Sequence, residues 1–64
     1  MKQEDKRVAV IYTNKVRRFA IVDVMTLEVI HRSGLYKTPQ NCKLAVGDYL
    51  MENMHLLLTN SAIF

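Results

Sequence analysis

Residues 7–13 read RVAVIYT, and residues 16–24, which follow Asn14 and Lys15, read VRRFAIVDV. Both stretches are rich in β-branched and aromatic residues, which favour strands, and Asn tolerates the backbone of a tight turn. The pattern therefore predicts two antiparallel strands joined by a hairpin turn. A third stretch, LEVIHR at residues 27–32, ends before a Ser-Gly pair and completes a predicted three-stranded meander.

The segment after the meander is rich in residues that break regular structure. Residues 35–43 contain a Pro-Gln-Asn run and are predicted to form a loop that crosses to the second half of the chain. Gly47 and Asp48 then stand between apolar residues, which indicates a tight turn or a bulged start of a strand.

Residues 49–58 fit two different structures. Their apolar residues recur at helical spacing, but two apolar runs also flank Glu52 and Asn53 as in a hairpin. Short segments around turn-forming residues favour the hairpin, and a short helix within 49–58 is the alternative. Residues 60–64 are predicted to form a turn and an apolar terminal stub.

Together these segments predict an all-β fold that is mainly antiparallel. The three-stranded meander is followed by a loop and a second hairpin, and so many short strands close into a small, partly open barrel or a bent sheet because closure removes exposed edges. We expect residues 1–6 to be a charged flexible N-terminus and residues 7–64 to form a single small domain.

Length and composition favour a packed core that needs support. The chain has 64 residues, 50% of them hydrophobic and 23% charged, which is typical of a folded domain. A chain this short buries only about 60% of the surface that it exposes when unfolded. Cys42 is the only cysteine, so no internal disulfide supplements the core. We therefore expect very good packing or a homo-oligomer.

The chain shows no targeting or membrane pattern. Its charged start is followed by an apolar run too short for a signal peptide, and its longest apolar runs fall far below the ~20 residues that span a bilayer. We expect a cytoplasmic protein without a membrane partner. The net charge of +3 is compatible with an anionic partner.

Strand alternation sorts the meander into two faces once a register is assumed. We take pairs whose residue numbers sum to about 28 across the first turn and to about 51 across the second. One face is then almost wholly apolar and is the predicted core: Val8, Val10, Tyr12, Val16, Arg18, Ala20, Val22, Val24, Leu27, Val29 and His31. The other face mixes arginines, isoleucines and one aromatic residue.

The mixed face predicts a binding surface, because apolar residues at alternate positions of a solvated sheet indicate that something covers them. We expect a non-catalytic small protein that acts through protein–protein interaction, by self-association and/or as a dedicated inhibitor or adaptor of a target protein. Small interaction proteins encoded by phages and plasmids are similar in composition. The candidate interface residues are Arg7, Ile11, Arg17, Phe19, Ile21, Ile30 and Arg32.

The alternative is a nucleic-acid-binding small β-barrel that uses the same face. Phe19 would stack on bases while Arg7, Arg17 and Arg32 contact phosphates. Catalysis and metal binding have weaker support. His31, Cys42 and His55 show no ligand spacing such as CxxC or HxxxH, and no nucleophile or phosphate-loop motif is present. We therefore predict no catalytic residues, no metal and no cofactor.

Overall fold

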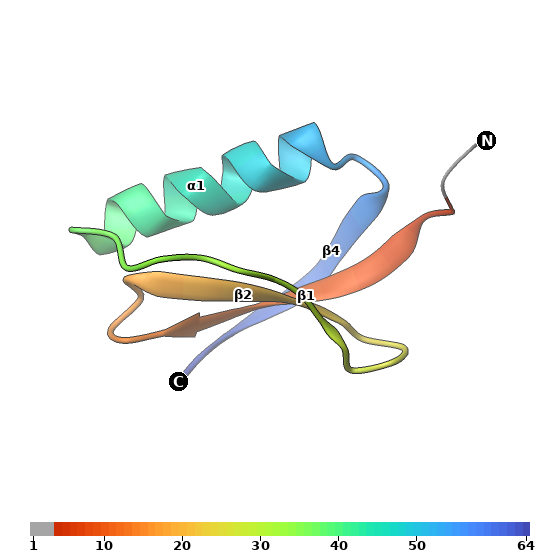
Figure 1. Cartoon of the computed structure of the whole chain (residues 1–64), viewed down its shortest axis with the longest axis horizontal. Helices are drawn as coiled ribbons and strands as arrows, with labels where there is room; N and C mark the ends of the chain where they lie inside the picture. Colours follow the sequence, from red (N-terminus) through yellow and green to blue (C-terminus); the bar gives the residue numbers. More distant parts are fainter. Residues whose placement is uncertain (1–3) are drawn as a thin grey trace.

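The computed structural model describes residues 4–64 and has a mixed α/β fold (Figure 1). Three strands, β1 (Lys6–Thr13), β2 (Arg18–Asp23) and β3 (Val29–Arg32), precede the helix α1 (Pro39–Glu52) and the strand β4 (Leu56–Ile63). The four strands form one sheet in the order β3-β2-β1-β4, with β1 and β4 parallel. The prediction of an all-β barrel was therefore wrong, whereas the three-stranded meander is present.

The β1–β2 hairpin has a register that differs from the assumed one. Val10 pairs with Ile21 and Tyr12 with Phe19, so paired residue numbers sum to 31 and not to about 28. The cause is the turn, where Asn14, Lys15 and Val16 all have positive φ values near 60°. This longer turn moves the pairing by an odd number of residues, which transfers every β2 side chain to the opposite face.

The third strand pairs with β2 and contains a register shift. Ile21 lies opposite His31, whereas Val22 lies opposite Val29, so one residue is inserted between the two pairs. The β2–β3 turn is closed by Asp23, whose backbone N–H donates to the carbonyl oxygen of Glu28 at 2.8 Å. The third strand therefore begins two residues later than the sequence indicated.

Helix α1 occupies the segment that was predicted as a loop, a turn and part of a hairpin. Thr38 caps its start, because the Thr38 hydroxyl accepts a hydrogen bond from the Asn41 backbone N–H at 3.1 Å. Pro39 follows in the first turn, where a missing N–H costs nothing. At the other end, the backbone N–H and the side-chain amide of Asn53 both donate to the Tyr49 carbonyl oxygen. The helix thus reaches the start of the 49–58 segment only and ends at Glu52.

Strand β4 extends through residues that were predicted as a turn and a stub. It pairs with β1 from Lys6↔Leu56 to Tyr12↔Ile63, and a bulge at Thr59 lies between the pairs Val8↔Leu58 and Ala9↔Asn60. The Thr59 hydroxyl donates a hydrogen bond to the Val8 carbonyl oxygen at 3.0 Å and so stabilises the bulge. Of the predicted flexible N-terminus, Lys6 begins β1 and residues 1–3 lie outside the described residues.

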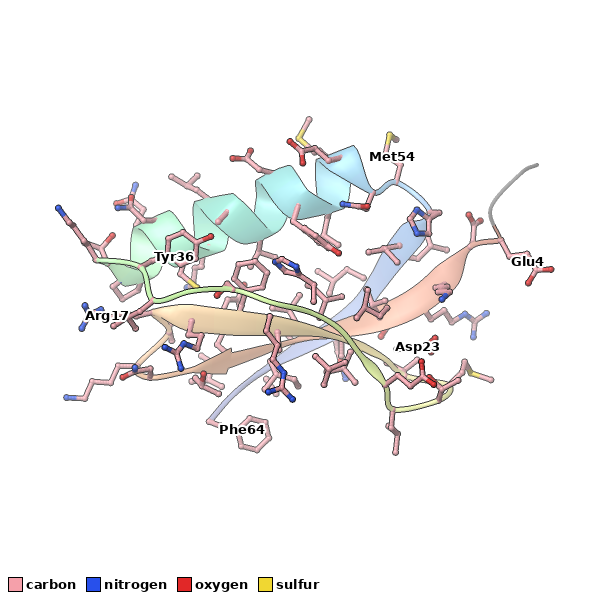
Figure 2. All side chains as sticks on the ribbon, viewed as in Figure 1. Glu4, Arg17, Asp23, Tyr36, Met54 and Phe64 are labelled. Carbon is pink, nitrogen blue, oxygen red and sulfur yellow. The ribbon has the colours of Figure 1, made fainter. Side chains whose placement is uncertain are left out.

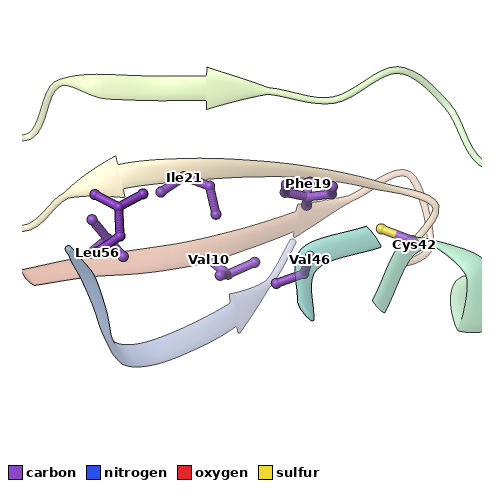
Figure 3. Packing of buried hydrophobic residues seen from close by; sticks show 7 residues of the cluster. Val10, Phe19, Ile21, Cys42, Val46 and Leu56 are labelled. Atoms are coloured by element: carbon purple, nitrogen blue, oxygen red, sulfur yellow. The ribbon is translucent and has the colours of Figure 1, made fainter. Parts of the chain in front are cut away.

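The core lies between α1 and one face of the sheet, which we call the covered face (Figure 3). Helix α1 contributes Cys42 and Val46, and the sheet contributes the remaining buried side chains: Val8, Val10, Phe19, Ile21 and Leu56. Because β3, α1 and β4 follow one another while β3 and β4 are the two edges of the sheet, the helix crosses from one edge to the other. It therefore covers a single face.

Candidate protein-binding surfaces

The opposite face of the sheet, the open face, has no helix over it within residues 4–64 (Figure 1). The strand register places on the open face the residues that alternate with the core residues along each strand. These residues are half-buried or exposed, with the exception of Ala9. A shallow hollow of about 400 Å³ lies there, lined by Ile11, Thr13, Arg18, Phe19, Ala20, Val22, Val29, Arg32 and Ser33. An apolar floor that solvent reaches is a feature of binding surfaces.

The charged residues that line this hollow are all positive. Arg18 lies at the start of β2 opposite Thr13, Arg32 lies opposite Ala20, and both arginine side chains are exposed. No carboxylate is among the lining residues. Arginines around apolar residues form the polar rim that protein interfaces use, and they also suit an anionic ligand.

Two of the predicted interface residues lie in the core instead of on a surface. Phe19 is 2% exposed and Ile21 is fully buried, both on the covered face. Phe19 is therefore not available as a stacking platform for bases. Its ring stacks on Tyr36, with centroids 6.2 Å apart, and lies tilted against His31.

The other predicted residues are dispersed. Ile11 and Arg32 lie together at the hollow of the open face. Arg7 is exposed on β1, and Ile30 is exposed at the edge strand β3. Arg17 is held in place, because its Nε donates to the Tyr36 carbonyl oxygen at 2.9 Å (Figure 2).

Sequence reasoning missed the residues that complete the open face. Arg18, Ala20, Val22 and Val29 were assigned to the core, although they line the hollow. The missed signal is the length of the first turn, since the apolar pattern of β2 is equally good on either face.

Three side chains that could take part in chemistry, His31, Cys42 and Tyr12, are packed against other residues of the domain. His31 stacks on Tyr49 of α1 with ring centroids 4.3 Å apart. Cys42 is fully buried, and this burial raises the pKa of its thiol. The pKa of Tyr12 is also raised, first by burial and then by the neighbouring Cys42. A buried thiol with a raised pKa is a poor nucleophile.

The described part of the chain offers no cluster of three or more His, Cys, Asp or Glu residues that could hold a metal ion. Within residues 4–64 no helix is long and apolar enough to cross a membrane.

A second hollow of about 280 Å³ lies where α1 leads into β4, and it is lined by Leu50, Met51, Met54 and Leu56. Apolar side chains are also exposed along β4 and at its end: Leu57 at 45%, Leu58 at 50%, Ile63 at 66% and Phe64 at 78%. Figure 2 shows Met54 at the end of α1 and Phe64 on the other side of the sheet. Sequence reasoning did not single out this region, because it assigned β4 partly to a stub.

No family model, curated protein or solved structure gives a significant match to this chain.

Proposed function

We propose that this chain is a non-catalytic binding protein that acts through protein–protein interaction, with the open face as its surface for a target protein. The observation that carries the proposal is the apolar hollow of that face, with Ile11, Val22 and Val29 at its floor and Arg18 and Arg32 beside them. A partner that buries this floor has an apolar centre, and its acidic rim pairs with the two arginines.

The alternative partner is nucleic acid. Arg18 and Arg32 on one exposed face support phosphate contacts, and the net charge of +3 has the right sign. Its weakness is the burial of Phe19, which removes the aromatic side chain expected to stack on bases. The protein partner is favoured because the floor of the hollow is aliphatic.

Affinity capture from a lysate of the cells that naturally make the chain tests the proposal, with nuclease added in one arm. The wild type is compared with Val29→Glu, which places a carboxylate in the hollow at a 43% exposed position. The matched control is Leu44→Glu on α1, at a 60% exposed position away from the hollow. Circular dichroism confirms that each variant is folded.

We expect at least one protein that the wild type and Leu44→Glu retain, that Val29→Glu loses, and that nuclease does not release. An identical set of proteins on all three baits would contradict the proposal. Loss of all partners on nuclease treatment, together with salt-sensitive binding of a mixed-sequence single-stranded oligonucleotide, would favour the alternative.

A further inference from the structure

The two edges of the sheet differ in how they are protected. Strand β3 has four residues and ends in His31 and Arg32, and short charged strands are how proteins block unwanted pairing. Strand β4 has eight residues, and residues 56–64 contain no charged residue and no proline. Its only protective feature of this kind is the bulge at Thr59. An edge that is this long and uncharged is a template for another strand.

We infer that β4 pairs with β4 of a second copy of the chain, in antiparallel orientation about a twofold axis perpendicular to the sheet. The result is a dimer with one continuous eight-stranded sheet and both helices on the same side. The occupant is a second copy because an antiparallel strand pair is self-complementary: each copy offers the same donors and acceptors in reverse order. The absence of charge along β4 also means that no like charges meet.

The surface area of the monomer leaves room for such an interface. The chain exposes 4946 Å², whereas a monomeric protein of 7.4 kDa exposes about 4200 Å² by the usual scaling of area with mass. The excess of about 700 Å² is close to the ~800 Å² that each partner buries in a standard interface. Exposed apolar side chains on β4 are available to supply it.

The face assignments of β4 limit the register, and we take the one that pairs all eight residues of the strand. Leu56 and Ile63 pair with Lys6 and Tyr12 of β1, which places both on the covered face, while Leu57 and Ala62 lie on the open face. Directly opposite residues of an antiparallel pair share a face. If the twofold axis passes between Thr59 and Asn60, residues on both sides of the bulge lie opposite residues of the same face. This placement sets Leu57 opposite Ala62 of the second copy and Leu56 opposite Ile63 of the second copy.

This register brings a side chain to the second hollow. Ile63 is 66% exposed in the monomer, and in the dimer it lies beside Leu56 of the second copy, at the hollow that Leu56 shares with Met54 and Leu50. The hollow of about 280 Å³ is larger than the ~150 Å³ cavity that admits a benzene ring, so one aliphatic side chain fits. Each copy gives one Ile63 and receives one, which is the exchange that a twofold interface requires.

The dimer goes beyond the proposed function and uses a different surface, so the two can be tested separately. Light scattering of the full chain across a concentration series should give twice 7.4 kDa, with little dependence on salt because backbone and apolar contacts dominate. Ile63→Glu should weaken dimerisation about tenfold or more and give the monomer mass. Ser61→Lys, which adds a charge at an exposed position of the edge, should do the same.

Val29→Glu is the matched control, because it changes the open face at the other edge and should leave the dimer intact. Conversely, Ile63→Glu should still capture the partner that Val29→Glu loses. A wild type that is monomeric throughout would overturn the inference. Folded Ile63→Glu and Ser61→Lys proteins that dimerise as tightly as the wild type would also overturn it, and a dimer broken by Val29→Glu would move the interface to the open face.

A cross-link tests the register. The double variant Leu57→Cys with Ala62→Cys should form an intermolecular disulfide on oxidation, because opposite Cα atoms lie about 4.5–5.5 Å apart. Within one strand these positions are about 16 Å apart, so no internal disulfide competes. Each single variant should stay uncross-linked, and buried Cys42 should not react. A dimer in which the double variant fails to cross-link, or in which a single variant succeeds, would overturn the register.

Discussion

The covered and open faces of the sheet differ in what their apolar residues do. Ile21 and Val22 are adjacent in β2, but Ile21 is fully buried beneath α1 whereas Val22 is half-buried at the hollow of the open face. The first residue contributes to folding through burial, whereas the second leaves part of its apolar surface exposed to solvent. The same kind of side chain thus serves stability on one face and, in the function that we propose, recognition on the other.

The largest expected effect comes from shortening a buried side chain on the covered face. Ile21→Ala should lower the free energy of unfolding by about 3 kcal/mol, because it removes buried methyl groups and leaves a cavity. Val22→Ala should lower it by about 1 kcal/mol or less, since Val22 keeps contact with solvent and loses fewer atoms. Urea unfolding followed by circular dichroism measures both. Equal losses would contradict the difference between the two faces.

The hairpin was predictable from the sequence because β-branched residues and the turn at Asn14 are local signals. The pairing was not, because the faces depend on whether the turn shifts β2 by an odd or even number of residues. Val16, a β-branched residue with a φ of 64°, is an unexpected member of that turn. As a result, the predicted binding surface contained Ile21, which lies in the core, and omitted Val22, which lines the hollow.

The helix was missed although its start signal is present. Thr38 followed by Pro39 is typical of a helix N-terminus, but the Pro-Gln-Asn run and Gly47 indicated a loop and a turn. Packing against the sheet stabilises the helix, because Cys42 and Val46 lie four residues apart on one helix face and both belong to the core. Without the helix, β4 could not be recognised as a parallel edge strand.

A second, smaller effect concerns Asp23, which is a polar residue among the buried side chains. Its Oδ1 accepts hydrogen bonds from the backbone N–H groups of Met25 at 2.8 Å and Thr26 at 3.4 Å. Asp23→Ala should lower the free energy of unfolding by about 1–2 kcal/mol, because the turn loses these two bonds and both N–H groups lose this acceptor. Asp23→Asn keeps an acceptor and should lose less, and an equal loss in chemical denaturation would argue against the turn as the cause.

A third comparison uses two adjacent arginines. Arg17→Gln should cost about 1 kcal/mol, because the hydrogen bond from Nε to the Tyr36 carbonyl oxygen is lost. Arg18→Gln on the open face should change stability by no more than about 0.5 kcal/mol, as exposed surface substitutions do. Thermal unfolding of both variants measures the difference. A large loss in Arg18→Gln would mean that Arg18 serves folding and not a partner.

The smallest effect is the pH dependence of the covered face. Burial raises the pKa of Cys42, so the folded chain holds the thiol proton more tightly than the unfolded chain does. Above the ordinary thiol pKa of about 8.5 the unfolded chain binds fewer protons, and stability should therefore fall as the pH rises from there. Tyr12, whose pKa is raised in the same direction, should add a second decline that starts near pH 10. Below about pH 8 both contributions are complete. Cys42→Ala should remove the first decline and Tyr12→Phe the second in unfolding curves recorded across this range, and an undiminished first decline in Cys42→Ala would assign it to another group.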